Sequence, residues 1–300
     1  MIIIINIFRI SLSFYLIFYY SLLNRKTMNT TKRHLFSVLI LSVLFAFSAY
    51  SQPQERPEFI TVTTFHWNQD LQDFSMDAWK AVEKEYFDKV TSKNEFIVSS
   101  LVLLHFFTAD NTEIKLVSGY TSWENIEKAS ARSDELAKEA WPDKDQRTAF
   151  FNKQMSYYSN MHSDEIHSTY PFAKVLTERS AEPQVYYVRI SHMDFPEGGT
   201  QKEIGDMMTD YFDKVINNNT TILGYFPNRH AWGADGRDFI EAFVVKSLGD
   251  VEKALKENIE LEKAAWPDET VRKAHLDKMG KYFTGFHADY IYSSVPEFTK

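Results

Sequence analysis

The stretch EAWPD (139–143) returns as AAWPD (264–268), 125 residues further along the chain. With the same offset, segments 136–171 and 261–296 share 15 of 36 positions without a gap, where unrelated segments of average composition would share about two. The offset also aligns EYFDKV (85–90) with DYFDKV (210–215). The sequence therefore predicts two copies of one unit, at 59–172 and 184–298, joined by a linker at 173–183.

Hydrophobic periodicity predicts the same element order in each copy. In the first copy we expect strands at 59–65, 95–107, 114–120 and 162–170, and helices at 75–90, 124–140 and 144–158. A turn at 108–113 joins the second and third strands. The order β-α-β-β-α-β, with its second helix broken, defines the ferredoxin-like unit, so the predicted fold class is α+β.

The repeated Trp-Pro-Asp is interpreted as a structural joint between two helices. Pro142 ends the first helix because it cannot continue the hydrogen-bond ladder. Asp143 is expected to cap the next helix and to pair with Arg147 one turn later. Asp268 and Arg272 repeat this pattern. A cap and a helix pair explain every residue type present, which favours this interpretation over a binding role.

The N-terminus predicts export. Residues 28–51 have a basic start, an apolar run and a small-residue ending, the form of a secretory signal peptide. Residues 1–27 are interpreted as leader, with the true start at Met28. The alternative is a membrane helix at 2–23. Cleavage after Ser51 would leave Gln52 first, followed by a linker at 52–58, and a periplasmic or secreted protein that makes no membrane contact after cleavage.

Composition excludes several classes of partner and site. The net charge is −8, with acidic and basic residues interspersed, so no basic stripe is available for nucleic acid. The chain has no cysteine, which excludes disulfides, thiolate metal sites and a lipidated cysteine.

Two tandem ferredoxin-like units resemble the dimeric α/β-barrel superfamily, over about 240 of the 300 residues. The resemblance rests on element order and duplication and selects no single member. It implies two sheets packed face to face as an intramolecular pseudo-dimeric barrel, helices outside, and ligands bound between a sheet and its helices. The superfamily includes cofactor-free monooxygenases acting on polycyclic phenols, haem-degrading monooxygenases, chlorite dismutase and proteins of unknown role, so fold alone selects no function.

Three histidines occupy equivalent positions in each copy. They are His66, His105 and His162, then His192, His230 and His287. Each set is expected near one edge of its sheet, while spacing leaves open whether the three share a face. In the last strand, identities between copies fall at 162, 164, 166 and 168 only, a period of two that marks one face. This shared polar face, with Asp164 and Asp289 beside the histidines and His167 opposite, suggests a pocket wall.

Several uses of these residues stay open. Histidines near strand ends often serve packing alone. In an enzyme they would act as general acid and base, with Asp164 orienting His162. Three imidazoles could hold a metal, and one could hold a haem.

The favoured prediction is an exported barrel that binds a small aromatic or apolar molecule in a His-lined pocket and, if it is an enzyme, oxidises it without a required cofactor. The candidate catalytic set is His66, His105, His162, Asp164, His192, His230, His287 and Asp289. The alternatives are a non-catalytic metal- or haem-binding module and a barrel that binds only other proteins.

Overall fold

A computed structural model describes residues 56–300. The predicted leader and signal peptide at 1–51 lie outside these residues. Within them, no helix combines the length and apolar character needed to cross a bilayer.

The predicted order β-α-β-β-α-β occurs twice. The first pass comprises β1 (Phe59–Trp67), α3 (Met76–Lys89), β2 (Ser99–Phe107), β3 (Glu113–Tyr120), α4 (Trp123–Ala140), α5 (Lys144–Met155) and β4 (Tyr158–Thr169). The second comprises β5 (Val185–Met193), α6 (Gln201–Tyr211), β6 (Gly224–Trp232), β7 (Asp238–Val245), α7 (Leu248–Ala265), α8 (Glu269–Gly280) and β8 (Phe283–Ser294). The last strand of the first pass begins four residues earlier than expected, so His162 lies inside it.

The eight strands of the described region form one closed antiparallel barrel. Their order is β1-β3-β2-β8-β5-β7-β6-β4, and β4 returns to β1. Pairings between β2 and β8 and between β4 and β6 join the two passes. The resemblance implied two sheets packed face to face; the strands instead pair edge to edge, which leaves no open strand edge in the barrel.

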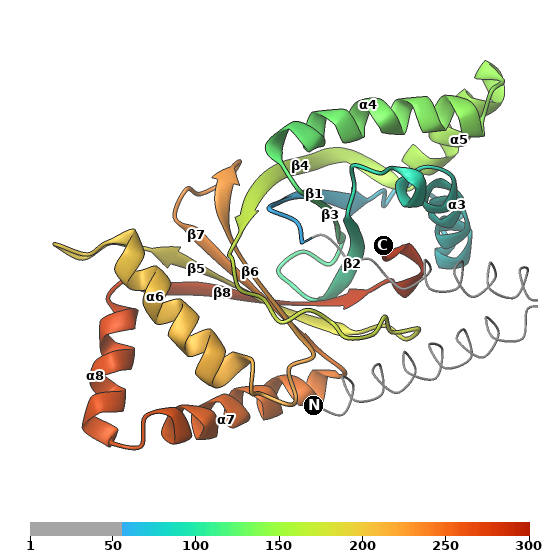
Figure 1. Ribbon diagram of the computed structural model, residues 1–300. Helices are drawn as coiled ribbons and strands as arrows, with labels where there is room; N and C mark the ends of the chain where they lie inside the picture. Colours follow the sequence, from blue (N-terminus) through green and yellow to red (C-terminus); the bar gives the residue numbers. More distant parts are fainter. Residues whose placement is uncertain (1–55) are drawn as a thin grey trace, which may run out of the picture. The chain divides into compact units, whose positions relative to one another are not determined.

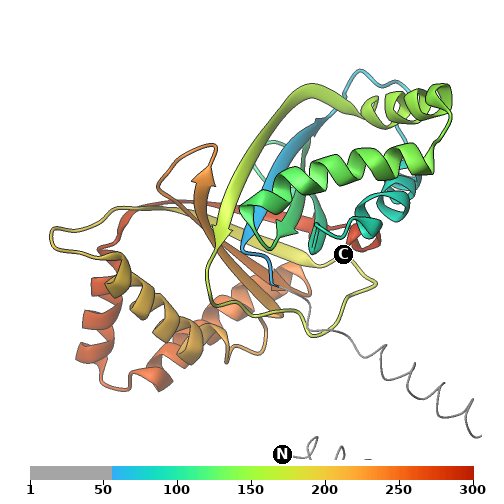
Figure 2. The same cartoon turned by 45° about the horizontal axis from the view of Figure 1, so that its top comes forward.

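The helices lie outside the barrel in two groups. In Figures 1 and 2, α3, α4 and α5 cover β1–β4, while α6, α7 and α8 cover β5–β8. Side chains therefore alternate between a helix-facing layer and the barrel interior. The largest helix-facing core joins Tyr187, Tyr225 and Phe243 of the sheet to Ile204 and Met208 of α6. The interior core contains strand residues such as Leu103, Tyr186, Val244 and Tyr292.

The Trp-Pro-Asp joint is structural, with one correction. Asp143 Oδ1 accepts a hydrogen bond from the backbone N–H of Gln146 at 2.8 Å, which confirms the predicted cap. The predicted pair with Arg147 is wrong: the Arg147 guanidinium donates to the Trp141 carbonyl oxygen at 2.7 Å. A helix that ends at a proline leaves its last carbonyls without partners, and the arginine satisfies one of them. Arg272 does the same for Trp266 in the second copy, at 2.8 Å.

Candidate functional site

The six predicted histidines lie on two different layers. Phe65, not His66, is in register with His162, so His66 and His162 point to opposite faces of the sheet. By strand alternation and register, four face the barrel interior, namely His66, His105, His192 and His230. His162 and His287 face the helix side. The structure therefore brings neither predicted triplet together as a whole, because the last strand presents its shared polar face outward. In the second pass, however, His192 and His287 line the same hollow.

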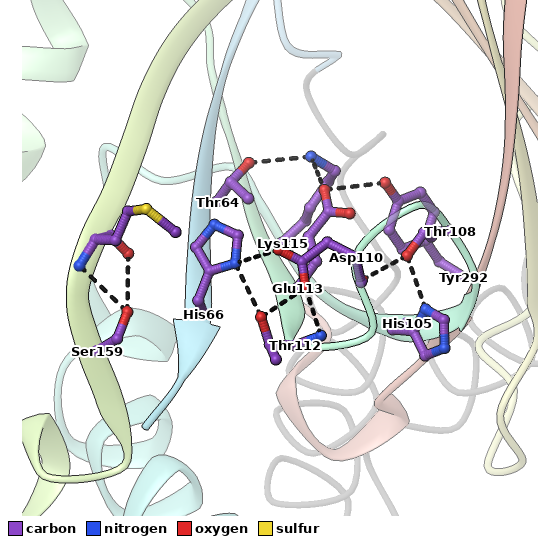
Figure 3. A network of polar contacts seen from close by, with 11 residues as sticks. Thr64, His66, His105, Thr108, Asp110, Thr112, Glu113, Lys115, Ser159 and Tyr292 are labelled. Carbon is purple, nitrogen blue, oxygen red and sulfur yellow. Dashed lines mark hydrogen bonds and ion pairs between the residues drawn. The ribbon is translucent and has the colours of Figure 1, made fainter. Parts of the chain in front are cut away.

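Around the β2–β3 turn, the two interior histidines of the first pass, His66 and His105, belong to a dense polar network (Figure 3). His66 Nδ1 lies 3.0 Å from Asp110 Oδ2 and 3.1 Å from Thr112 Oγ1. Glu113, in register with His66, lies 2.5 Å from Lys115 Nζ and accepts a hydrogen bond from the Tyr292 hydroxyl at 3.2 Å. We call His66, Asp110 and Glu113 the first hairpin cluster; each of its charged groups has a partner.

The equivalent residues around the β6–β7 turn form the second hairpin cluster, His192, Asp235 and Asp238. His192 Nε2 lies 3.3 Å from Asp238 Oδ1 and 4.0 Å from Asp235 Oδ2. This cluster lines a hollow of about 320 Å³ together with His287, Ile190 and Tyr290, so this hollow, unlike a purely apolar one, contains two of the predicted histidines. Nearby, on the interior face, His167 is buried and bonds Glu165 at 2.9 Å, on the face opposite His162 as predicted.

The two helix-facing His–Asp pairs differ in their surroundings. His162 Nε2 lies 3.3 Å from Asp164 Oδ2, and both side chains are more than half exposed, at 54% and 62%. His287 Nδ1 lies 2.7 Å from Asp289 Oδ2. Asp289 also accepts hydrogen bonds from the Tyr187 hydroxyl at 2.6 Å and from Arg189 Nε at 3.0 Å. The second pair is therefore tied to two residues that line a pocket.

That pocket, of about 370 Å³, lies between strands β5–β8 and helices α6–α8. The resemblance implied a ligand site in this layer. The lining is mostly aromatic and aliphatic, with the polar exceptions Arg189, Glu241, Asn258 and Glu262 and the hydroxyls of Tyr187, Tyr211 and Tyr225. Exposed Leu255 and Ile259 lie on its α7 side. Among residues 56–300, no histidine lines this pocket, so the expectation of a His-lined pocket does not apply to it.

A local change in helix geometry contributes to the pocket. After α6 the chain makes one π-helical turn, Phe212–Ile216, and both end residues of this turn line the pocket. The equivalent stretch of the first pass continues α3 as a regular helix to Lys89. π-turns within helices occur frequently at functional sites.

Glu241 is the carboxyl of the pocket lining whose pKa is raised. Burial raises the pKa of its carboxyl, although a hydrogen bond from the Tyr225 hydroxyl at 2.8 Å acts in the opposite direction. The accessible surface that Glu241 keeps faces the pocket. Glu241 therefore holds its proton to higher pH than an ordinary carboxyl and can donate it to a bound acceptor.

The other polar groups of the pocket form two pairs. Burial alone would raise the pKa of Asp289, but its bonds with Tyr187 and Arg189 lower it overall, so Arg189 faces the pocket already partnered by a carboxylate. Burial and the bond to Glu262, at 2.6 Å, raise the pKa of Tyr211. Tyr211 therefore stays a neutral hydroxyl.

The equivalent layer of the first pass has different chemistry. The offset between the copies is 126 residues in the first strand and 125 after one inserted residue near 70. At these offsets, Thr61, Thr63, Ser100 and Leu116 replace Tyr187, Arg189, Tyr225 and Glu241. There the buried carboxyl is Glu83 of α3, which accepts hydrogen bonds from Tyr158 at 2.7 Å and Gln154 at 3.0 Å. Burial raises its pKa as well. In the second pass the equivalents of Glu83, Gln154 and Tyr158 are Met208, Met279 and Phe283, which line the pocket.

Sequence reasoning missed the pocket residues because it weighted identities between the copies. The pocket is made by positions at which the copies differ, such as Leu116 and Glu241. A charged residue in one copy at a position that is apolar in the other was the available signal.

Comparison with known proteins establishes the fold class. No family model and no curated protein matches the sequence. Among solved structures, a "Putative monooxygenase" from Fusobacterium nucleatum is similar at 11% identity and a TM-score of 0.51, over 79% of this chain and 91% of that one. A mutant chlorite dismutase from Candidatus Nitrospira defluvii is similar at 12% identity and a TM-score of 0.49, over 81% and 94%. An anthrone oxidase-like protein gives 14% and 0.44, over 81% and 93%.

The described chain therefore has the fold of the dimeric α/β-barrel (ferredoxin-like) superfamily, as the sequence predicted. At these identities the likeness concerns the fold and does not define a reaction.

Proposed function

We propose that this chain binds a small, neutral aromatic molecule carrying a hydroxyl or carbonyl oxygen, in the pocket between strands β5–β8 and helices α6–α8. The observation that carries the proposal is Glu241, a carboxyl of raised pKa in a mostly apolar pocket of about 370 Å³. Small-molecule sites are typically apolar concavities with a few convergent polar groups, and perturbed carboxyls concentrate at them.

The charges around the pocket support a neutral ligand. Arg189 is partnered by Asp289, at 3.0 Å, so it offers little unbalanced positive charge. Burial raises the pKa of the Glu241 carboxyl and so favours its neutral form, and Glu262 is hydrogen-bonded by Tyr211. An anionic ligand would meet Glu262 without a free cation, whereas a neutral oxygen can accept a hydrogen bond from Glu241.

Oxidation of the ligand by dioxygen is the enzymatic form of the same proposal: a phenol takes up one oxygen atom and becomes a quinone, and the second oxygen atom leaves as water, so that no separate reductant is required. This enzymatic form is supported by the Fusobacterium nucleatum protein of the same fold, which is described as a monooxygenase. Glu241 would then transfer a proton to or from the ligand oxygen, because it is the carboxyl in the pocket with the perturbed pKa. Haem binding is less favoured, since no imidazole among the described residues lines the pocket to serve as an axial ligand.

We also propose that the two passes behave as a pseudo-dimer within one chain. The pairing of β2 with β8 and of β4 with β6 is equivalent under the internal offset: His105 is in register with Tyr292, and His230 with His167. Such two-fold equivalence is what an isologous dimer interface would show.

The ligand proposal is tested with two matched variants, each of which introduces the residue that the other copy carries. Glu241→Leu mimics Leu116, and Glu83→Met mimics Met208. The ligands are 1-naphthol and naphthalene, measured by isothermal titration calorimetry. We expect Glu241→Leu to weaken 1-naphthol binding roughly tenfold, because one hydrogen bond to a buried group is worth about 1 kcal/mol or somewhat more.

Naphthalene binding should be nearly unchanged by Glu241→Leu, since naphthalene has no oxygen to accept the proton. Glu83→Met should leave the binding of both ligands intact. If the wild-type protein binds neither ligand, or if both variants weaken 1-naphthol equally, the pocket is not the site.

A further inference from the structure

We propose that the second hairpin cluster, His192, Asp235 and Asp238, is a binding site for one divalent transition-metal ion. The inference is independent of the ligand proposal, because the cluster faces the barrel interior and the ligand pocket lies on the helix side of the sheet.

The fold brings three side chains that can bind a metal ion close together. One ligand atom from each residue lies within 4.8 Å of those of the other two. His192 ends β5 and Asp238 begins β7, and these two residues are in register across the sheet. Asp235 comes from the turn between β6 and β7. Two carboxylate oxygens and one imidazole nitrogen suit ions such as Zn²⁺, Mn²⁺, Fe²⁺ and Co²⁺.

One carboxylate oxygen of Asp238 receives no hydrogen bond and has only an ion-pair contact with His192. Its Oδ1 atom is buried and accepts no hydrogen bond within the described structure. The neighbouring atom is His192 Nε2 at 3.3 Å. A buried carboxylate oxygen without a hydrogen bond is costly, and each such atom in a native protein requires an explanation. A cation between Asp238 and His192 would supply the missing contact.

The first hairpin cluster shows how the same arrangement is satisfied without a metal. There Lys115 Nζ lies 2.5 Å from Glu113 and donates to Thr64 Oγ1 at 3.0 Å (Figure 3). In the second copy, the equivalents of Glu113 and Lys115 are Asp238 and Ile240. The acidic residue is kept while its internal cation is replaced by an apolar side chain. The second cluster therefore has the apolar side chain of Ile240 at the position where the first has the ammonium group of Lys115.

Among residues 56–300, Arg237 is the lysine or arginine that pairs with the second cluster. Its guanidinium bonds both oxygens of Asp235, with Nε at 2.9 Å from Oδ1, and it is 57% exposed. This pairing holds Asp235 in position from the solvent side and does not reach Asp238. Carboxylates that bind metals are commonly held by such outer hydrogen bonds.

The neighbouring hollow suits an open coordination sphere. Its volume is about 320 Å³, and Tyr290 and Phe286 line it beside the cluster. Three protein ligands leave coordination positions for water or a small exogenous ligand, as in metal sites that are not purely structural.

The test measures Zn²⁺ binding to the chain by calorimetry, with Co²⁺ absorption as a second readout of inner-sphere ligands. Wild-type protein should bind one Zn²⁺ saturably. Asp238→Asn and His192→Gln should each weaken binding roughly tenfold or more. Ile240→Lys, which imitates Lys115, should abolish binding while thermal unfolding shows a folded protein. His66→Gln, in the first cluster, is the matched control and should bind Zn²⁺ as wild type does.

Two results would overturn the proposal. One is the absence of saturable binding to wild-type protein at millimolar Zn²⁺. The other is equal loss in His66→Gln and His192→Gln, which would locate the ion elsewhere. If Ile240→Lys does not fold, Asp238→Asn decides alone: unchanged Zn²⁺ affinity in that variant rejects the site.

Discussion

Two partly buried carboxyls of raised pKa, Glu241 and Glu83, lie on the helix side of the barrel, one in each pass. Glu83 is held by Tyr158 and Gln154, whereas Glu241 has Tyr225 and an open pocket. Burial raises the pKa of both carboxyls. Glu83 is used in packing by its two partners, whereas Glu241 remains available to a ligand in the pocket.

This raised pKa predicts a pH dependence of stability. In the unfolded chain Glu241 titrates near its ordinary pKa of about 4.3. In the folded protein it keeps its proton to higher pH, so its stabilising contribution is complete below the unfolded pKa and is lost as pH rises through the folded one. Glu241→Leu should therefore show a smaller loss of unfolding free energy than wild type between about pH 5 and pH 8.

Urea titrations at several pH values measure this difference, and Glu83→Met should show a similar flattening because the cause is the same. Parallel pH profiles for wild type and Glu241→Leu would mean that the carboxyl is ordinary in the folded protein.

At the scale of elements, the strand edges decide whether half of the chain can exist alone. A fragment of residues 56–176 would contain β1–β4 in the order β4-β1-β3-β2, with β4 and β2 as edges that have lost β6 and β8. Unpaired edges recruit further strands. We expect this fragment to form a homodimer, each β2 pairing with the other copy's β4, or to aggregate. Light scattering after size exclusion measures the mass, and a stable monomer would contradict the pseudo-dimer.

The elements were largely predictable from the sequence, and their pairing across the two passes was not. Alternation and apolar stripes locate strands and helices because these periods reflect local geometry. Some strand boundaries differ from the prediction because ladder hydrogen bonds extend beyond the alternating apolar pattern. Strand β4, for example, begins at Tyr158, four residues before His162. The expected Asp143–Arg147 pair failed because the guanidinium found an unpaired carbonyl, a competition that spacing does not reveal.

The histidines show a second limit of sequence reasoning. The predicted element order places His66 and His162 on neighbouring strands, and the structure confirms that β1 pairs with β4. The one-residue register offset that separates their faces comes from strand pairing, and a slip of one residue exchanges the faces of a strand. Only Asp289 of the predicted set touches residues that line the helix-side pocket.

At the scale of the whole molecule, the two passes share a backbone and differ in chemistry. The second carries the helix-side pocket, with Glu241 and its π-turn, and on the interior side Asp238, whose Oδ1 receives no hydrogen bond. The first fills the equivalent positions with Glu83 and its partners and with Lys115. The two passes therefore complete one closed barrel together, while both proposed sites lie in the second pass.

The location of the aromatic ligand can be tested by anomalous diffraction from crystals soaked with 6-bromo-2-naphthol. We expect a bromine peak in the pocket between β5–β8 and α6–α8, with the naphthol oxygen within hydrogen-bond distance of Glu241. An ordered peak found only in the barrel interior or on the helix side of the first pass would contradict it.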